Sequence, residues 1–267
     1  MTKQPIFKAI AKSYLRANRT NLLSRLFRSA HRRYRVILNR RRFSGKTSRD
    51  IFTEIYETGS WGRESDHDGF YSGSGSHDDA ITRPYIQAVR DFLLDMGKPD
   101  VVDIGCGDFA VGSQLRPYCD SYIAGDIVES LIARNRVKYE GLNVDFRVID
   151  VANDEIPKSK ILLVRQVFQH MSNADILKAI DNINGSCDYL VLTEHLPYND
   201  NFPHNLEKAI GPDIRLYVDT PSGVVLTSSP FNLAVIESKV ICEVVVDDGV
   251  GRSVIQTIVY KMSGHKR

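Results

Sequence analysis

The chain has 267 residues, a formal net charge of +2 and 42% hydrophobic residues, which suits one domain of ordinary size with an extension. It contains no run of about 18 apolar residues, so no membrane-spanning helix is predicted. Its four cysteines lack C-x-x-C spacing, which argues against a disulfide framework or a zinc site. We therefore expect a metal-free protein of a reducing compartment, located in the cytoplasm.

Charge is divided unevenly along the chain. Residues 1–49 hold 15 of the 35 basic residues and none of the 33 acidic ones, so residues 50–267 carry a net charge of −13. Apolar residues recur at helical spacing among the arginines, and Arg40 to Arg49 resembles a linker. We predict a basic amphipathic N-terminal extension, 1–49, and one domain, 50–267. The extension suits a peripheral position on an anionic membrane surface, a disordered tail, an organelle-targeting peptide or a nucleic-acid contact.

The predicted elements begin with a helix from Ile51 to Tyr56, which leads to Trp61 and a glycine- and serine-rich loop, 72–76. A second helix, 82–96, precedes a regular alternation of strands and helices. Strands are expected at 101–104, 122–127, 144–148, 161–164 and 189–193, and two β-rich runs, 233–246 and 253–262, follow as a hairpin. This order predicts an α/β Rossmann-like fold. Its seven-stranded sheet is parallel apart from the antiparallel C-terminal hairpin and has helices on both faces.

The most informative motif is the turn after the first strand, where Gly105, Cys106 and Gly107 follow Asp103. Glycine permits positive φ and lets a ligand lie close against the backbone. A helix predicted from Ala110 to Leu115 directs its N-terminus at the turn. The carboxylate of Asp103 would repel a pyrophosphate but suits the cationic amino group of a methionine moiety. S-adenosylmethionine (SAM) therefore fits the turn better than NAD.

Further acidic residues stand at the ends of the next two strands. Asp126, with Ile127, lies roughly 20 residues past the glycines, where a carboxylate accepts hydrogen bonds from both ribose hydroxyls. Asp150, with Val151, follows the third strand and suits the adenine amino group. Because the carboxyl ends of parallel strands meet at one edge of a sheet, we expect these acids to line one crevice.

Two histidines are candidate general bases because each follows a predicted parallel strand. His170 lies a few residues after the fourth strand, which ends at Arg165 and Gln166, and His195 follows the fifth. Imidazole suits the removal of a hydroxyl proton near neutral pH. The alternative for either ring is a structural role, in which it caps a helix or binds a backbone carbonyl.

Along residues 51–262 the chain resembles the class I SAM-dependent methyltransferases, and more narrowly a subgroup linked to polysaccharide and other glycan modification. The resemblance implies SAM as the cofactor and adds Arg165 and Gln166 to the cofactor-binding residues. Relatives commonly have an acid where this chain has Gln166, which moves the expected base role to His170. The residues that carry the resemblance are Trp61-Gly62 with Glu64-Ser65, Ser72 to Ser76, Asp103 to Phe109, Gly125 to Val128, Arg165-Gln166 with His170, Asp213 to Arg215 and Ser229 to Leu233.

Acceptor binding is expected in the long segment 199–231 and at Trp61. Asp213 and Arg215 suit sugar hydroxyls or an anionic group, with surface ion pairing as the alternative. Trp61 suits stacking on a sugar ring or packing in the core.

We expect O-methylation of a sugar or glycan hydroxyl. The alternatives are methylation of another small or lipid-linked metabolite, and a non-catalytic SAM-binding module. We expect neither a nucleic-acid substrate, because residues 50–267 are acidic, nor an obligate protein partner.

Overall fold

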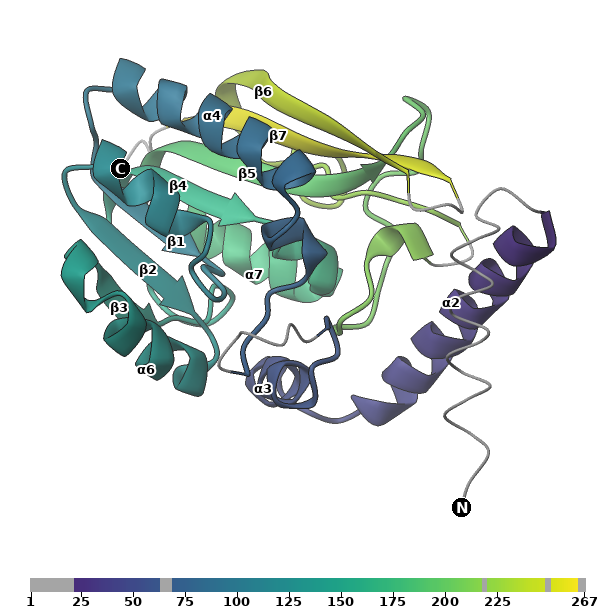
Figure 1. Ribbon diagram of the computed structural model, residues 1–267. Helices are drawn as coiled ribbons and strands as arrows, with labels where there is room; N and C mark the ends of the chain where they lie inside the picture. The colour runs from purple at the N-terminus through teal and green to yellow at the C-terminus, as the bar shows by residue number, and fades with distance from the viewer. Residues whose placement is uncertain (1–21, 63–68, 218–219, 248–250, 264–267) are drawn as a thin grey trace.

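The computed structural model describes residues 22–62, 69–217, 220–247 and 251–263. Seven strands form one sheet in the order β3-β2-β1-β4-β5-β7-β6 (Figure 1). Strands β1 to β5 pair in parallel, and β7 lies antiparallel between β5 and β6. This arrangement confirms the expected fold class. The strands are β1 Val101–Ile104, β2 Tyr122–Asp126, β3 Asp145–Val148, β4 Ser159–Arg165, β5 Cys187–Pro197, β6 Val235–Asp247 and β7 Arg252–Met262.

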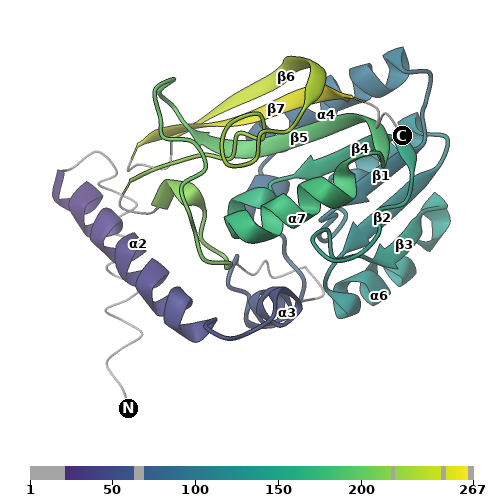
Figure 2. The ribbon, with the colours of Figure 1, turned by 180° about the vertical axis from the view of Figure 1, so that it is seen from behind.

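Helices cover both faces of the sheet. Figure 1 shows α4 in front of the strands, and Figure 2, from behind, shows α7 in front of the opposite face. The α-helices are α2 Leu22–Arg42, α3 Ser48–Thr58, α4 Asp79–Asp95, α5 Gly112–Leu115, α6 Glu129–Lys138 and α7 Asn173–Ile183. Short 3-10 turns are η1 Ser74–Ser76, η2 Arg116–Tyr118, η3 Glu140–Leu142, η4 Phe168–His170 and η5 Arg215–Tyr217.

The apolar run of β4 shows how the core forms. Leu162 and Val164 pack in the cluster that includes Ile176 and Ile180 of α7. Ile161 and Leu163 point to the other face, into the cluster that includes α4. Because side chains alternate along a strand and both faces are covered by helices, a central strand needs apolar residues at every position.

Strand β5 is longer than the sequence indicates. We expected it to end at Thr193, but it continues to Pro197 because β7 pairs with it antiparallel as far as Pro197 and Ser253. His195 therefore lies within the strand, and the expectation that it follows the end of the strand is wrong.

The expected linker from Arg40 to Arg49 is also wrong. Arg40 to Arg42 form the last turn of α2, and α3 already begins at Ser48, after the N-cap Thr47. Between the two helices, Phe43 is buried against Ile51 and other apolar residues of the domain. The end of the basic extension is thus anchored in the core. Its first part, residues 1–21, lies outside the described residues, and no helix of the described part is long and apolar enough to span a membrane.

Candidate active site

The turn after β1 is shaped by two glycines with positive φ, +73° at Gly105 and +57° at Gly107. A Cβ atom at Gly105 would lie 2.3 Å from a methyl of Val167, and one at Gly107 would lie 2.4 Å from the Ser72 hydroxyl. The turn therefore fits tightly between two other segments of the chain. The expected helix from Ala110 is a single turn that begins only at Gly112, so it contributes little helix dipole to the site.

Two carboxylates are buried beside this turn. Asp126 accepts hydrogen bonds from the backbone amides of Gly107, at 3.1 Å, and Val128, at 3.0 Å. Asp103 accepts one from the Tyr122 hydroxyl at 2.9 Å. Burial raises the pKa of Asp103 to about 7 and that of Asp126 to about 6. A carboxylate in such surroundings gains most from a ligand that carries positive charge or donates hydrogen bonds.

Asp150 differs from the other two acids because its carboxylate is engaged locally. Its oxygens accept hydrogen bonds from the backbone amide of Ala152 at 3.0 Å and from the side chain of Asn153 at 2.8 Å. Asp150 is thus placed at the site as expected, but it also holds the turn after β3.

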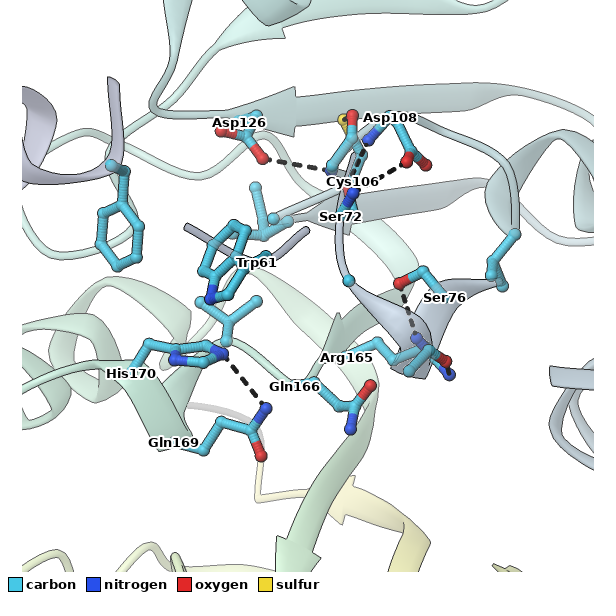
Figure 3. Close-up of a pocket in the computed structure, with 18 of the residues that line it drawn as sticks. Trp61, Ser72, Ser76, Cys106, Asp108, Asp126, Arg165, Gln166, Gln169 and His170 are labelled. Carbon is cyan, nitrogen blue, oxygen red and sulfur yellow. Dashed lines mark hydrogen bonds between the residues drawn. The ribbon is translucent and has the colours of Figure 1, made fainter. Parts of the chain in front are cut away.

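One cavity of about 370 Å³ connects these acids with the region expected to bind the acceptor. The glycine turn lines it, as do Phe52 and Tyr56 of α3. Figure 3 shows Trp61 and His170 close together in it, and the part beside these two residues is called the acceptor end below. Of the residues predicted from the sequence, those that line it are Trp61, Asp103, Gly105, Cys106, Gly107, Asp126, Ile127, Asp150, Val151, Arg165, Gln166, His170 and His195. The described residues contain no group of three or more His, Cys, Asp or Glu that would hold a metal ion.

The 69–77 segment, which contributes Ser72 to Ser76 to the cavity lining, is tied to the glycine turn by Asp108. One oxygen of this carboxylate accepts a hydrogen bond from the Ser72 amide at 3.0 Å, and the Asp108 amide donates to the Ser72 hydroxyl at 2.8 Å (Figure 3). The same oxygen lies 2.6 Å from the His77 ring. Burial alone would raise the pKa of Asp108, but these hydrogen bonds outweigh it and hold the pKa below its usual value. The sequence places Asp108 directly after the glycines but gives no signal for the pairing with His77.

Arg165, at the end of β4, forms a second attachment for the 69–77 segment. Its guanidinium donates to the carbonyl of Gly75 at 2.6 Å and to the hydroxyl of Ser76 at 3.3 Å, and lies 4.8 Å from the centre of the Tyr85 ring. The next residue, Gln166, has φ +56°, which turns the chain away from the sheet. Arg165 therefore lines the cavity and also holds the segment that covers it.

His170 lies at the acceptor end of the cavity, with its ring centre 5.1 Å from that of Trp61 (Figure 3). Its Nδ1 is 3.2 Å from the Gly211 carbonyl, and its Nε2 is 3.2 Å from the Gln169 amide nitrogen. These partners fix the tautomer with the proton on Nδ1, because a carbonyl only accepts and an amide nitrogen only donates. Burial, and then the charge of Lys208, lower the pKa of His170 to about 3, so the ring is neutral at physiological pH.

His195 reaches the same cavity from within β5. Its Nε2 lies 2.7 Å from the hydroxyl of Ser253 on the paired strand β7. The ring is thus held between two strands, whereas His170 sits on a short turn beside Trp61. The position of His170 suits contact with an acceptor better.

Asp213 and Arg215 do not line the cavity. Asp213 accepts a hydrogen bond from Asn39 of α2 at 2.6 Å. Arg215 is 1% exposed and donates to the Met171 carbonyl at 2.9 Å and to the Asn173 side chain at 3.0 Å. Both side chains therefore hold the 199–231 segment in place, and we leave them out of the proposed acceptor site.

No protein-family model matches the sequence, and no curated protein matches it significantly. Similar solved structures include magnesium protoporphyrin IX methyltransferase (ChlM) from Synechocystis PCC 6803 with bound SAM, 14% identical with a TM-score of 0.51, covering 82% of this chain and 99% of that one. NodS, an N-methyltransferase from Bradyrhizobium japonicum WM9 in complex with S-adenosyl-L-homocysteine, is 14% identical with a TM-score of 0.49, covering 68% and 87%. At this identity the likeness to ChlM shows the fold alone.

Proposed function

We propose that this chain is a SAM-dependent methyltransferase whose acceptor is a hydroxyl of a sugar or glycan. The observation that carries the proposal is the single cavity that joins the buried acids of β1 and β2 to Trp61 and His170. Methyl transfer requires donor and acceptor to be aligned within one enclosed site, and alignment supplies much of the rate.

The residues at the glycine turn suit SAM. Asp103 would pair with the ammonium of its methionine part, and Asp126 would accept hydrogen bonds from the ribose hydroxyls. Ile127 and Val151 offer apolar surface for the adenine. When bound, SAM supplies a methyl group that a sulfonium already activates. The likeness of the fold to ChlM, which was solved with bound SAM, supports this assignment.

The acceptor end of the cavity combines aromatic surface with a few polar groups. Trp61 and His170 lie side by side there, and Phe52 and Tyr217 also line the cavity. Tyr56 lies instead at the glycine turn, where its hydroxyl is 3.0 Å from that of Ser72. Aromatic rings suit the apolar faces of a sugar ring, while imidazole and amide groups suit its hydroxyls. This combination supports a sugar or glycan acceptor.

His170 is the proposed acceptor of the hydroxyl proton. A hydroxyl oxygen that gains a methyl group becomes an oxonium, which is a far stronger acid than an imidazolium, so a ring of low pKa still takes the proton. The proton moves to Nε2, because Nδ1 already carries one and donates it to the Gly211 carbonyl. For this step the acceptor hydroxyl would replace the Gln169 side chain as the partner of Nε2. A pKa of about 3 also keeps the ring unprotonated before each turnover and returns the proton readily to water.

The first test is calorimetric titration of the full chain with SAM and S-adenosylhomocysteine. Wild type should bind with micromolar affinity, and Asp126→Ala should lose binding. Asp145→Ala, an exposed acid on β3, is the matched control and should bind like wild type. Incubation with methyl-labelled SAM and a panel of glycans then tests the acceptor. Failure of folded wild type to bind SAM would overturn the enzymatic proposal, whereas labelling of a non-glycan acceptor alone would overturn the glycan part.

A further inference from the structure

Helix α2 presents an apolar strip to solvent. Tyr34, Ile37 and Leu38 are 59%, 54% and 43% exposed. Their spacing of three and four residues places them on one side of the helix. Figures 1 and 2 both show α2 at the periphery of the molecule, away from the sheet. An exposed patch of this kind marks an interaction site rather than a part of the core.

The other side of α2 is attached to the domain close to the acceptor end of the cavity. Asn39 donates to Asp213 at 2.6 Å, and Arg35 lies 4.0 Å from the same carboxylate. The neighbouring Pro212 lines the cavity, and its carbonyl accepts a hydrogen bond from Trp61 at 3.2 Å. The helix is therefore held with its apolar strip facing outward, and its attachment lies next to the acceptor end.

The charge of α2 identifies the kind of partner. Its 21 residues include eight arginines and no acid, while residues 50–267 carry a net charge of −13. A basic helix with an exposed apolar strip is the pattern of helices that lie in the surface of an anionic bilayer. A nucleic acid would satisfy the arginines, but it would leave Ile37 and Leu38 in contact with phosphate or water.

We propose that α2 docks on an anionic lipid surface, with Tyr34, Ile37 and Leu38 inserted at the level of the headgroups and the exposed Arg40 and Arg41 against lipid phosphates. Docking in this way brings the acceptor end of the cavity near the membrane. The interaction goes beyond the proposed methyl transfer and does not depend on it, since it uses residues outside the cavity.

Sedimentation of the full-length protein with lipid vesicles tests the proposal. Wild type should bind phosphatidylcholine vesicles that contain about one third phosphatidylserine, and should not bind pure phosphatidylcholine. Leu38→Glu should weaken binding by about tenfold or more, because it removes an inserted apolar group and adds a repelled charge. Leu94→Glu is the matched control, since Leu94 lies on helix α4 with 45% exposure, and should bind like wild type.

A variant with fewer positive charges tests the attraction between the arginines of α2 and the anionic lipid. Arg40→Gln with Arg41→Gln should weaken vesicle binding by about tenfold or more, whereas Arg83→Gln with Arg90→Gln on α4 should not. Equal vesicle binding by wild type, Leu38→Glu and the Arg40/Arg41 variant would overturn the proposal. So would tight binding to an RNA oligonucleotide that Leu38→Glu retains in full. Circular dichroism and thermal unfolding of the same variants show that they are folded whether or not the protein binds SAM, which keeps this test separate from that of the enzymatic proposal.

Discussion

The imidazole Nε2 of His77 lies 2.6 Å from the Asp108 carboxylate, although 31 positions separate the two residues. His77 is the last residue of the 69–77 segment, and Asp108 directly follows the glycine turn. The His77 ring is also stacked on Tyr71, with ring centres 4.6 Å apart. The pair of His77 and Asp108 therefore attaches the 69–77 segment to the turn proposed to bind SAM.

Removing the negative charge of Asp108 should make SAM dissociate faster. Asp108→Asn weakens the acceptor for both His77 and the Ser72 amide, so we expect dissociation about tenfold faster, with a smaller change in association. The chain has one tryptophan, and Trp61 lines the cavity, so stopped-flow fluorescence reports both rates. Asp145→Asn serves as control. An unchanged dissociation rate in Asp108→Asn would show that the pair does not retain the ligand.

Replacing Gly107 by alanine should lower stability by more than backbone strain alone explains, because the turn is tightly packed there. Gly107→Ala combines positive φ with a contact at 2.4 Å to Ser72, whereas Gly97→Ala has a similar φ, +76°, and open space around it. Gly97→Ala should lower the free energy of unfolding by about 1 kcal/mol and leave SAM binding intact. Gly107→Ala should cost more and weaken SAM binding at least tenfold, as denaturant unfolding and calorimetry would show. Equal effects of the two substitutions would contradict the tight fit.

Asp103 should make the ligand-free protein less stable as the pH rises. Burial raises its pKa to about 7, whereas an unfolded chain has a pKa of about 3.9. The folded state therefore binds the proton more tightly, and stability falls between about pH 4 and pH 7. Asp103→Asn keeps an acceptor for Tyr122 without the charge, so it should raise the melting temperature by several degrees at pH 8 and by little at pH 4. A lower melting temperature at pH 8 would contradict this reasoning.

The same residue should make SAM binding depend on pH. The carboxylate must be ionised to pair with the ammonium, so the affinity of wild type should fall as the pH drops below about 7. Asp103→Asn should bind more weakly and lose most of this dependence. Calorimetric titrations at pH 5.5 and pH 8 measure both effects. A variant that keeps the full dependence would assign it to another group, of which Asp126 is the first candidate.

His170 should not titrate between pH 5 and pH 8. Its pKa is lowered to about 3, below the unfolded value of about 6.5, so His170 stabilises the fold above pH 6.5 and this contribution is lost as the pH falls. NMR of ring-labelled protein should show one histidine with constant shifts over this range, and that signal should vanish in His170→Gln.

Turnover measures the role of His170 as a base. With a glycan acceptor identified, His170→Gln should lower kcat by roughly 10²-fold and leave the affinity for SAM unchanged. The wild-type rate should not fall with the protonation of an ordinary imidazole near pH 6.5. Asp145→Asn again provides the control. Turnover that is unaffected in His170→Gln would move the proposed base role to His195.

Local patterns in the sequence were enough to predict the framework of the site. The alternation of strand and helix periods predicted the parallel sheet, and the two β-rich runs at 233–246 and 253–262 predicted its antiparallel end. The residues after β1 to β4 line the same cavity because parallel strands end at one edge of a sheet. Each of these features depends on residues that are close together in the chain, or on a rule of topology that applies to every open parallel sheet.

The fold, the glycine turn and the acids beside it could therefore be predicted from the amino-acid sequence. The pairing of His77 with Asp108, the contact of Asn39 with Asp213 and the burial of Arg215 away from the cavity become visible only in the folded chain. These contacts join segments up to 174 positions apart, and no local period indicates them. The length of β5 was decided in the same way, since a strand extends as far as its partner continues to supply hydrogen bonds.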